Sequence, residues 1–481
     1  MQKENKLIKS LGTWEVMVAG IALVVASSTL VSDFTGFFSL GIYFAAALLG
    51  GFIINLLLGL TTAELAVSYP KAGAVYNYAK EIFKGKNGSF IGVFLGLTFW
   101  GMCAFAVSGE TVSGAYAFKS LLNSDYDISF FVLLLTVLAI IPNIFGIKTM
   151  AWVNMILLLF MIGIRWFFGI AGFMNIGNSG SWSFDNLVNG FGSFQLLGEG
   201  GILIAGLSLA VWSFIGIEFA ASLAEEVKNP KRSIPKGIIF GLIIILLTSL
   251  VMGVGVAGTQ TGEYWQGIVA GELGNNGESP HLAVGYVMFG DFGLLLMSLA
   301  SIAATLGSIT VIYTAMPRIL FSIARDGKLF SPGISNSVSK LNSKFRTPIN
   351  ATLITMAVYI LPALYSGEVI KWIFSAAYVW MMLYVVFHIL LFVNRKKEQE
   401  NRILPFVKKL NILPITGVCV TIAGIYIAFY GAHLEFGTRA LIVLALSFVI
   451  SILSYGFVKR KKYSLYDLEI SEKEVIEELI S

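Results

Sequence analysis

Three charged residues stand inside long apolar stretches of this sequence, where charge is costly. Glu110, Arg165 and Glu218 are each surrounded by aliphatic, aromatic and small residues. On insertion scales, a charged side chain at the centre of a membrane-spanning helix costs about 2.5–3.5 kcal/mol. Glu218 also follows Gly216 closely, and glycine weakens a helix. A charge beside such a weak point indicates a polar cavity at bilayer depth.

Glu110 and Arg165 are expected at equal depth on two different spans. Lys119 marks the expected outer end of one span, and Asn175 marks that of the other. At about 1.5 Å per residue, both charges then lie roughly 15 Å below the outer surface. An ion pair is the least costly way to hold two opposite charges there. The sequence therefore predicts a Glu110–Arg165 pair, either beside a ligand route or as a link that only holds two helices together.

Two roles fit Glu218 equally well. Burial in a medium of low dielectric favours the protonated form of a carboxyl group, so Glu218 is a candidate for reversible protonation. The same carboxyl group can instead bridge an interrupted helix to its neighbours through hydrogen bonds. Both hypotheses stay open at this point.

The composition defines an integral membrane protein. Of the 481 residues, 56% are hydrophobic and 13% are charged, whereas soluble proteins carry about 25% charged residues. A span needs roughly 20 apolar residues. We expect twelve spans, which leave no room for a separate soluble domain. They run near residues 13–36, 40–66, 89–118, 128–145, 149–175, 198–222, 236–257, 289–315, 348–366, 370–393, 411–430 and 437–458.

The basic residues indicate the topology. With both termini in the cytoplasm of the cell, the expected outer loops hold only Lys119, Lys371 and Arg439 of the 33 basic residues. This asymmetry follows the positive-inside rule. It also explains the net charge of +5, so the charge gives no argument for nucleic acid as a partner. Cys103 and Cys419 both fall in expected spans and predict neither a disulfide nor a metal site.

Two non-adjacent spans carry small or polar residues at mid-depth. The first has Ala-Ser-Ser-Thr at residues 26–29, and the sixth has Ser-Phe-Ile-Gly at residues 213–216. Such interruptions at matching positions predict an inverted repeat with a binding site between its halves. The fold class is therefore all-α, with about twelve membrane helices in a 5+5 plan and discontinuous helices 1 and 6. The expected units are an N-terminal segment 1–12, repeats 13–175 and 198–393, two added spans in 411–458, and a cytoplasmic tail 459–481.

The sixth span and its exit carry a resemblance to a known family. Residues 212–218 read Trp-Ser-Phe-Ile-Gly-Ile-Glu, and residues 224–235 continue the pattern to Ser-Ile-Pro. They resemble the sixth-helix signature of the amino acid–polyamine–organocation superfamily. Further segments agree with that family in the same order along the chain. These are residues 62–66, 69–76, 306–308, 318–320, 324–327 and 347–348.

The resemblance implies a LeuT-like fold and secondary transport of amino acids or amines. It implies alternating access, driven by proton symport or by exchange. Ala26, Ser27 and Ser28 occupy the first-helix break, where the family usually has Gly-Ser-Gly, and both glycines are replaced here. Trp212 and Phe214 take the place of aromatics that close over the ligand. Free N–H and C=O groups at such breaks suit the carboxylate and the ammonium of an amino acid.

The remaining candidates follow from helical spacing and from the same resemblance. Cys103 and Val107 share a helical stripe with Glu110. Ile312 stands where arginine–agmatine exchangers have an aromatic residue, which argues against arginine as the substrate. Tyr378 lies nearer mid-depth in the tenth span. The predicted binding residues are Ala26, Ser27, Ser28, Thr29, Cys103, Val107, Trp212, Phe214, Ile215, Gly216, Ile312 and Tyr378.

Charged candidates fall into two groups by depth. Glu110, Arg165 and Glu218 are assigned to coupling or gating within the membrane. In some members of the superfamily a fifth-helix lysine replaces a sodium ion, but that position falls near Phe160, so the role is not given to Arg165. Charged residues at the inner helix ends are expected to fix or gate the cytoplasmic face. They are Glu64, Arg318, Arg325 and Asp326.

Several functions remain open at this point. A neutral or apolar amino acid suits the aromatic and aliphatic candidates. A positively charged amine, such as ethanolamine or a polyamine, is the alternative, with Glu110 and Glu218 as counter-charges. An ion channel and a sensor without turnover are less favoured. With three histidines and no nucleophile–base or metal spacing, we expect no enzyme, cofactor or metal; the expected partners are a small substrate, a proton and the lipid bilayer.

Overall fold

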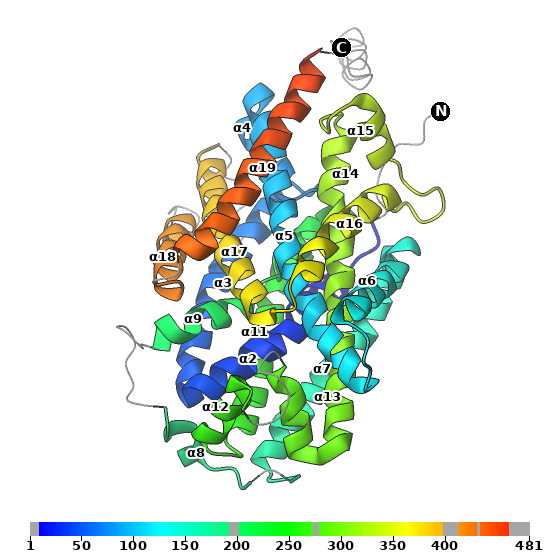
Figure 1. Cartoon of the computed structure of the whole chain (residues 1–481). Coiled ribbons are helices and arrows are strands. Elements are labelled where there is room, and N and C mark those ends of the chain that lie inside the picture. The colour runs from blue at the N-terminus through cyan, green and yellow to red at the C-terminus, as the bar shows by residue number, and fades with distance from the viewer. Residues whose placement is uncertain are drawn as a thin grey trace.

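The computed structural model describes residues 9–178, 180–191, 202–272, 279–397, 412–430 and 433–460. Within these residues the chain is a helical bundle, and the one β-type pairing is a bridge between Leu11 and Val227. Figure 1 shows an elongated bundle in which most helices run along the long axis. The predicted tail 459–481 lies outside the described residues except for its first two positions.

Each of the twelve expected spans corresponds to one helix or to one broken pair. In the first part of the chain the elements are α1 (Thr13–Val24), α2 (Ser27–Leu40), η1 (Gly41–Tyr43), α3 (Phe44–Ser68), α4 (Val75–Phe83), α5 (Gly85–Leu121), α6 (Ile128–Ile144), α7 (Ile147–Phe173) and α8 (Phe184–Val188). The rest are α9 (Ile202–Trp212), α10 (Phe219–Ser222), η2 (Ala224–Glu226), α11 (Pro230–Ala257), α12 (Gly262–Ala270), α13 (Pro280–Ala315), α14 (Pro317–Arg325), α15 (Pro332–Val338), α16 (Ile349–Tyr365), α17 (Val369–Lys397), α18 (Ile412–Ala428) and α19 (His433–Arg460).

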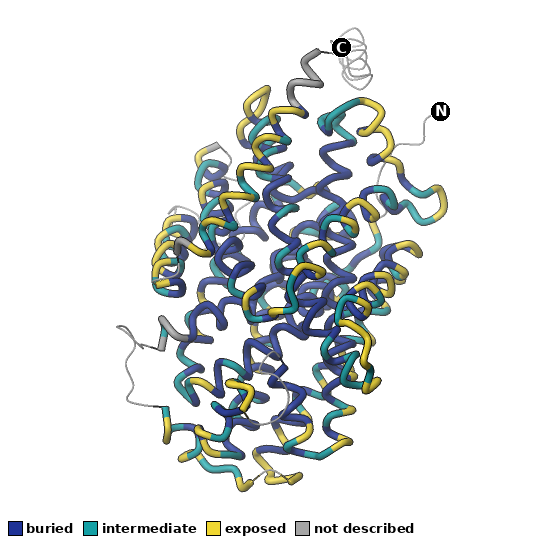
Figure 2. Tube along the Cα trace, viewed as in Figure 1, coloured by how far each residue is buried: buried dark blue, intermediate teal, exposed yellow. Residues whose placement is uncertain are grey.

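The helices have the dimensions and surface of a membrane protein. Among the described residues, seven helical stretches are long and apolar enough to cross a membrane, and four shorter helices are apolar as well. On α7, Trp152, Ile156 and Leu159 are exposed at helical spacing, so they form an apolar stripe that suits lipid. Figure 2 shows exposed residues along the outside of the bundle and buried residues through its middle. The predicted all-α, multi-span fold is confirmed.

Two helices are interrupted where the sequence predicts. Helix α1 ends at Val24, and α2 begins at Ser27 after an extended Ala26 with φ −98° and ψ 175°. Helix α9 ends at Trp212, and helical geometry resumes in α10 at Phe219. Prediction and structure therefore agree on both discontinuous helices.

Gly216 gives the second break its shape. Its φ is +119°, a value that side-chain-bearing residues rarely adopt, and a Cβ atom added there would lie 1.7 Å from Cδ2 of Leu23. Glycine thus serves two needs at this position, since it permits the turn and lets the chain approach α1 closely. The two breaks are brought side by side in this way.

The broken helices occupy the centre of the bundle. Helix α1 packs against α7, α11 and α13, whereas α9 packs against α2, α3 and α17. Helix α13 begins earlier than the expected span, because a short helical segment that starts at Pro280 joins it through a kink at Phe289 and Gly290. The repeat boundaries at residues 175, 198 and 393 remain predictions.

Candidate functional site

Arg165 binds the backbone of the first break at Ala26. Its Nη2 donates to the Ala26 carbonyl at 2.7 Å and to Thr29 Oγ1 at 2.8 Å. Thr29 Oγ1 also donates to the same carbonyl and accepts from the Ala26 amide. Ala26 is the N-cap of α2, and its carbonyl also accepts from the Leu30 amide at 3.4 Å, so Arg165 adds a charged donor to a carbonyl that begins α2. Arg165 therefore stabilises the break.

Glu110 occupies the amide end of the same break. The Ser28 amide donates to Glu110 Oε2 at 3.4 Å, and the Ser28 hydroxyl donates to the other carboxylate oxygen. The indole of Trp212 donates to Ser28 Oγ at 2.8 Å. A negative charge is favourable at the N-terminus of a helix, so the Glu110 carboxylate suits the start of α2.

The sixth-helix break is capped in a similar manner. Glu218 accepts from the Gly216 amide at 3.0 Å and from the Trp380 indole at 2.5 Å. On the carbonyl side, Asn55 donates to the Val211 carbonyl at 3.3 Å. Glu218 therefore links the sixth-helix break to α17 through hydrogen bonds, as the bridging hypothesis expects.

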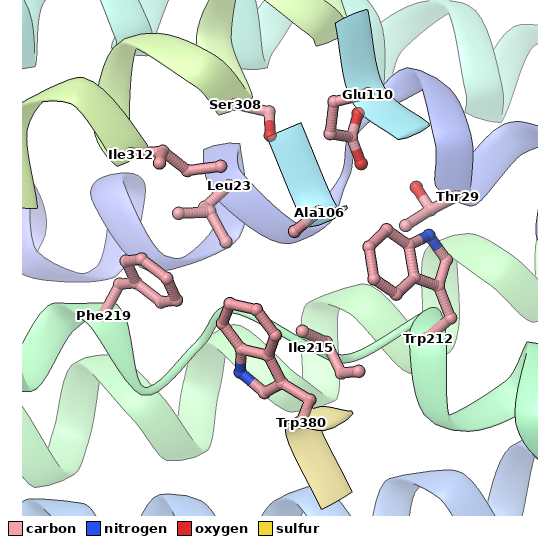
Figure 3. A pocket seen from close by; sticks show the side chains of 10 residues that line it. All are labelled: Leu23, Thr29, Ala106, Glu110, Trp212, Ile215, Phe219, Ser308, Ile312 and Trp380. Carbon is pink, nitrogen blue, oxygen red and sulfur yellow. The ribbon is translucent and has the colours of Figure 1, made fainter. Parts of the chain in front are cut away.

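A small enclosed cavity lies between the two breaks. Its volume is about 20 Å³, and by this measure one water molecule needs about 10–15 Å³. An amino acid is much larger, so the lining side chains must move apart before one can enter. Figure 3 shows Trp212 and Glu110 at one end and Phe219 and Ile312 at the other. The lining residues are Leu23, Thr29, Ala106, Glu110, Trp212, Ile215, Phe219, Ser308, Ile312 and Trp380.

Five of the sequence candidates lie on this cavity: Thr29, Glu110, Trp212, Ile215 and Ile312. Their contributions come from both breaks, from α5 and from α13. The cavity wall is mostly apolar, which is the lining that the sequence predicts for a neutral substrate.

Four of the predicted binding residues lie in the helix breaks but do not line the cavity. Ala26, Ser28 and Gly216 provide the backbone groups described above. Ser27 donates to or accepts from Ser113 at 2.6 Å and Ser301 at 2.5 Å. Ser27 therefore ties the first break to α5 and α13.

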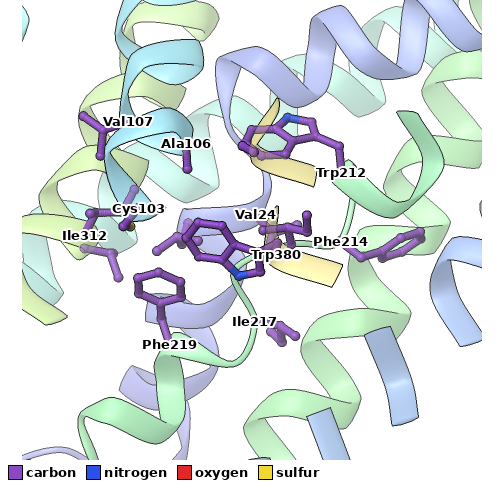
Figure 4. Packing of buried hydrophobic residues seen from close by; sticks show 14 of the residues in the cluster. Val24, Cys103, Ala106, Val107, Trp212, Phe214, Ile217, Phe219, Ile312 and Trp380 are labelled. Carbon is purple, nitrogen blue, oxygen red and sulfur yellow. The ribbon is translucent and has the colours of Figure 1, made fainter. Parts of the chain in front are cut away.

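Phe214 and Tyr378, two of the predicted binding residues, do not line this cavity, and their contact with a ligand stays a prediction. Phe214 packs edge-to-face on Phe52 with ring centroids 5.8 Å apart, and Figure 4 shows it pointing away from Trp380. Tyr378 packs on Phe429 of the segment after α18, with ring centroids 4.9 Å apart. Helix α17 lines the cavity with Trp380 instead.

Cys103 and Val107 are also absent from the cavity wall. Both are buried on α5, and the intervening Ala106 supplies the α5 surface that faces the cavity, together with Glu110. In Figure 4 the two side chains lie with Ile312 in the surrounding hydrophobic packing. Of the residues on the predicted stripe, Glu110 lines the cavity, whereas Cys103 and Val107 do not.

The predicted ion pair between Glu110 and Arg165 is wrong. Arg165 Nη1 instead lies 3.6 Å from Asp33 Oδ2 on α2. Asp33 is fully buried and accepts hydrogen bonds from Ser213 at 2.6 Å and Ser249 at 2.8 Å. Sequence reasoning missed Asp33, although it stands four residues after Thr29 and so on the same helical face.

The four residues assigned to the inner network all form ion pairs. Glu64 holds Arg395 through two contacts of 2.7 Å. Arg318 binds Glu226 through contacts of 2.5 and 2.9 Å, and both side chains are buried. Each pair joins elements that are distant in the sequence.

The other two network residues, Arg325 and Asp326, also have charged partners. Arg325 binds Glu225 at 3.0 Å, and Glu225 also accepts from the Ala72 amide at 2.7 Å. Asp326 accepts from the Tyr76 hydroxyl at 2.5 Å and pairs with a lysine of α4. The partners lie on α4, on η2 and in the loop after α3, so these contacts join segments that are distant in the sequence.

Interrupted helices around an enclosed cavity, in a bundle of membrane-length helices, define a multi-pass membrane protein of the transporter class. A model of the amino acid permease family matches residues 11–453. The chain belongs to that family, whose members are transporters and not enzymes.

Three relatives illustrate the similarity. The branched-chain amino acid permease BcaP of Bacillus subtilis (strain 168) is 24% identical over 373 residues, which is 73% of each chain. The serine/threonine exchanger SteT of the same organism is 23% identical, over 86% of this chain and 90% of its own. The gamma-aminobutyric acid permease of that organism is 22% identical, over 88% and 89%.

Proposed function

We propose that this chain carries an amino acid across the cell membrane by alternating access, with both termini in the cytoplasm. The observation that carries the proposal is that the two helix breaks meet at one enclosed cavity. Helix ends offer N–H groups to a carboxylate and C=O groups to an ammonium once the side chains that bind them here move aside. The family match and the amino acid permeases among the relatives support the same substrate class.

A neutral, apolar side chain suits the cavity best. Leu23, Ile215, Phe219 and Ile312 supply aliphatic and aromatic surface, and burial of apolar surface is favourable by about 25 cal/mol per Å². One relative is named for branched-chain amino acids, which are of this kind. We take leucine as the representative substrate.

The ion pairs on the two sides of the cavity provide the gates. On one side, Asp33 and Arg165 hold α2 to α7, with Ser213 and Ser249 bound to Asp33. On the other side, Arg318 and Arg325 hold Glu226 and Glu225. Alternating access requires that one set separate while the other stays closed. Glu110 and Glu218 are the proposed protonation sites that couple this movement to a proton gradient.

Uptake by purified protein in liposomes tests the proposal. A panel of tritiated amino acids and amines is offered with and without an imposed pH gradient. Saturable uptake of leucine that unlabelled apolar amino acids compete supports the carrier. An ohmic current without saturation indicates a channel instead. Stimulation by the pH gradient indicates symport, and uptake that requires amino acid inside the vesicle indicates exchange.

An amine is the second candidate substrate, and one observation favours it. Among the residues that line the cavity, the one charged group is the Glu110 carboxylate. It would serve as the counter-charge for an ammonium group that has no carboxylate of its own. Uptake of ethanolamine or a polyamine, in preference to every amino acid in the same panel, would select this alternative.

A further inference from the structure

We propose that Glu110 is a tethered competitor for the carboxylate of the substrate. It occupies the amide end of α2 while no amino acid is bound, and it yields that place by taking up one proton. The inference depends on the proposed function, because it requires a substrate that has a carboxylate. It adds a reason why such a substrate would move together with a proton.

The competition follows from where the Glu110 carboxylate lies. It accepts from both the amide and the hydroxyl of Ser28, at the positive end of the α2 dipole. At the same time Glu110 lines the cavity, so a ligand that reaches this helix end meets it. The donors that would bind a substrate carboxylate are thus already in use by a carboxylate of the protein.

Two carboxylates cannot share this place while both are ionised. Like charges in contact within a site of low dielectric favour protonation of one of them. The step is Glu110-COO⁻ + H⁺ → Glu110-COOH, with the proton taken from water on the entry side. No other bond is made or broken. When the amino acid leaves, Glu110 releases the proton to water on the exit side and binds Ser28 again.

Arg165 cannot neutralise the second carboxylate by moving together with Glu110. It acts on Glu110 electrostatically, but its guanidinium is held by the Ala26 carbonyl, Thr29 and Asp33. Buried titratable groups on α5 itself, on α2, on α13 and in the sixth-helix break are Cys103, Asp33, His281, Tyr313 and Glu218.

A second polar group marks this end of the cavity as a place for a ligand. The hydroxyl of Ser308 on α13 is buried, lines the cavity and has no hydrogen-bond partner among the described residues. A buried hydroxyl without a partner is costly. A polar substrate group beside Glu110 would satisfy it.

The test measures binding of leucine and of 3-methylbutylamine, which is leucine without its carboxylate. Wild type, Glu110→Gln and Glu368→Gln are compared in detergent at mildly acidic and mildly alkaline pH. Glu368 is an exposed outer carboxylate that pairs with Lys371, so its variant is the matched control for the same chemical change. Size-exclusion elution and thermal unfolding verify that each variant is folded.

For wild type and Glu368→Gln, the Kd for leucine should rise by up to about tenfold per pH unit once Glu110 is ionised. In Glu110→Gln the Kd for leucine should not change with pH, and at the alkaline pH it should be at least about tenfold lower than in wild type. The amine should show neither effect, because it does not compete for the α2 amides.

Two results would overturn the proposal. If Glu110→Gln binds leucine more weakly than wild type, or keeps the wild-type pH dependence, Glu110 does not compete with the carboxylate. If wild type binds the amine but no amino acid, and Glu110→Gln loses the amine, then Glu110 is a counter-ion and the proposed amino acid substrate fails as well. If wild type binds leucine but Glu110→Gln binds it more weakly or with unchanged pH dependence, only the competitor role of Glu110 fails. The proposed function is then unaffected.

Discussion

Arg165 of α7 and Glu110 of α5 bind the same helix break at positions two residues apart. Arg165 donates to the Ala26 carbonyl at 2.7 Å, and Glu110 accepts from the Ser28 amide at 3.4 Å. The anion suits the N-terminus of α2, whereas the cation binds the carbonyl and the hydroxyl of Ala26 and Thr29 at the same helix start. They are therefore related through the backbone of the break rather than through a direct ion pair.

The first prediction concerns Asp33. Replacing Asp33 with Asn removes the ion partner of Arg165, and a buried charge without its partner costs about 3–5 kcal/mol. We expect a marked drop in the thermal unfolding temperature in detergent. Adding Arg165→Met should recover part of the loss, because it removes the uncompensated charge.

A second cycle serves as the control for that experiment. Glu110→Gln combined with Arg165→Met should show a smaller coupling energy than the Asp33 cycle, because Glu110 makes no ion pair with Arg165. Equal coupling in the two cycles would contradict the assignment of Asp33 as the partner.

A sequence can give the depth of a charge but not the neighbour that it faces. The span ends place Glu110 and Arg165 at the same level, and both do reach the same break. Which side chain lies opposite depends on how each helix is rotated, and successive residues differ by about 100° of rotation. For the same reason the sequence points to Tyr378 on α17, although Trp380, two positions later, is the residue of that helix that lines the cavity.

The breaks themselves were predictable from local chemistry. Gly216 and the small or hydroxyl residues 26–29 weaken a helix wherever they occur, and no tertiary information is needed to see it. The inner network was predicted from charges at span ends, but its partners Glu225, Glu226 and Arg395 come from distant segments. Only packing specifies such pairs.

The second prediction concerns the glycine at the sixth-helix break. Gly216→Ala requires a backbone conformation that costs of order 1–3 kcal/mol for a residue with a side chain. The added Cβ would also collide with Leu23, at 1.7 Å. We expect leucine uptake to fall to about one tenth of wild type or less, because a cost of about 1.4 kcal/mol already corresponds to a factor of ten. Gly163→Ala is the control, because nothing lies within 4 Å of a Cβ there; equal loss in both would remove the argument.

The third prediction concerns α17. Trp380→Phe keeps an aromatic ring but removes the indole N–H that donates to Glu218 at 2.5 Å. A hydrogen bond to a charged group contributes about 1.5–3 kcal/mol, so we expect the KM for leucine uptake to rise by about tenfold or more. Tyr378→Phe should leave KM unchanged, since that ring packs on Phe429. A larger effect from Tyr378→Phe would restore the original expectation.

The fourth prediction concerns the inner gate. Arg325 and Glu225 are partly exposed and 3.0 Å apart, so charge reversal is tolerable in either. Arg325→Glu should open the inner side, and a cysteine placed at Ala106, with Cys103 and Cys419 replaced by serine, should react faster with a thiol reagent added from that side. The double variant Arg325→Glu/Glu225→Arg should return the rate partway, because the Ala72 amide still loses its acceptor. No recovery would mean that the pair does not hold the gate.

The fifth prediction separates the two roles of Glu218. Its carboxylate accepts from the Gly216 amide at one oxygen and from the Trp380 indole at the other, so Glu218→Gln keeps only one of these bonds, because the amide NH2 group cannot accept. If Glu218 carries a coupled proton, Glu218→Gln should abolish uptake driven by a pH gradient while counterflow of leucine continues, because exchange needs no net proton movement. If it is only a bridge, both activities should fall together and the pH dependence of the residual uptake should match wild type.

Since Glu218 does not line the cavity, whereas Glu110 does, we expect leucine to lose its pH-dependent binding in Glu110→Gln and to keep it in Glu218→Gln. The reverse order would place the substrate-linked proton on the sixth helix.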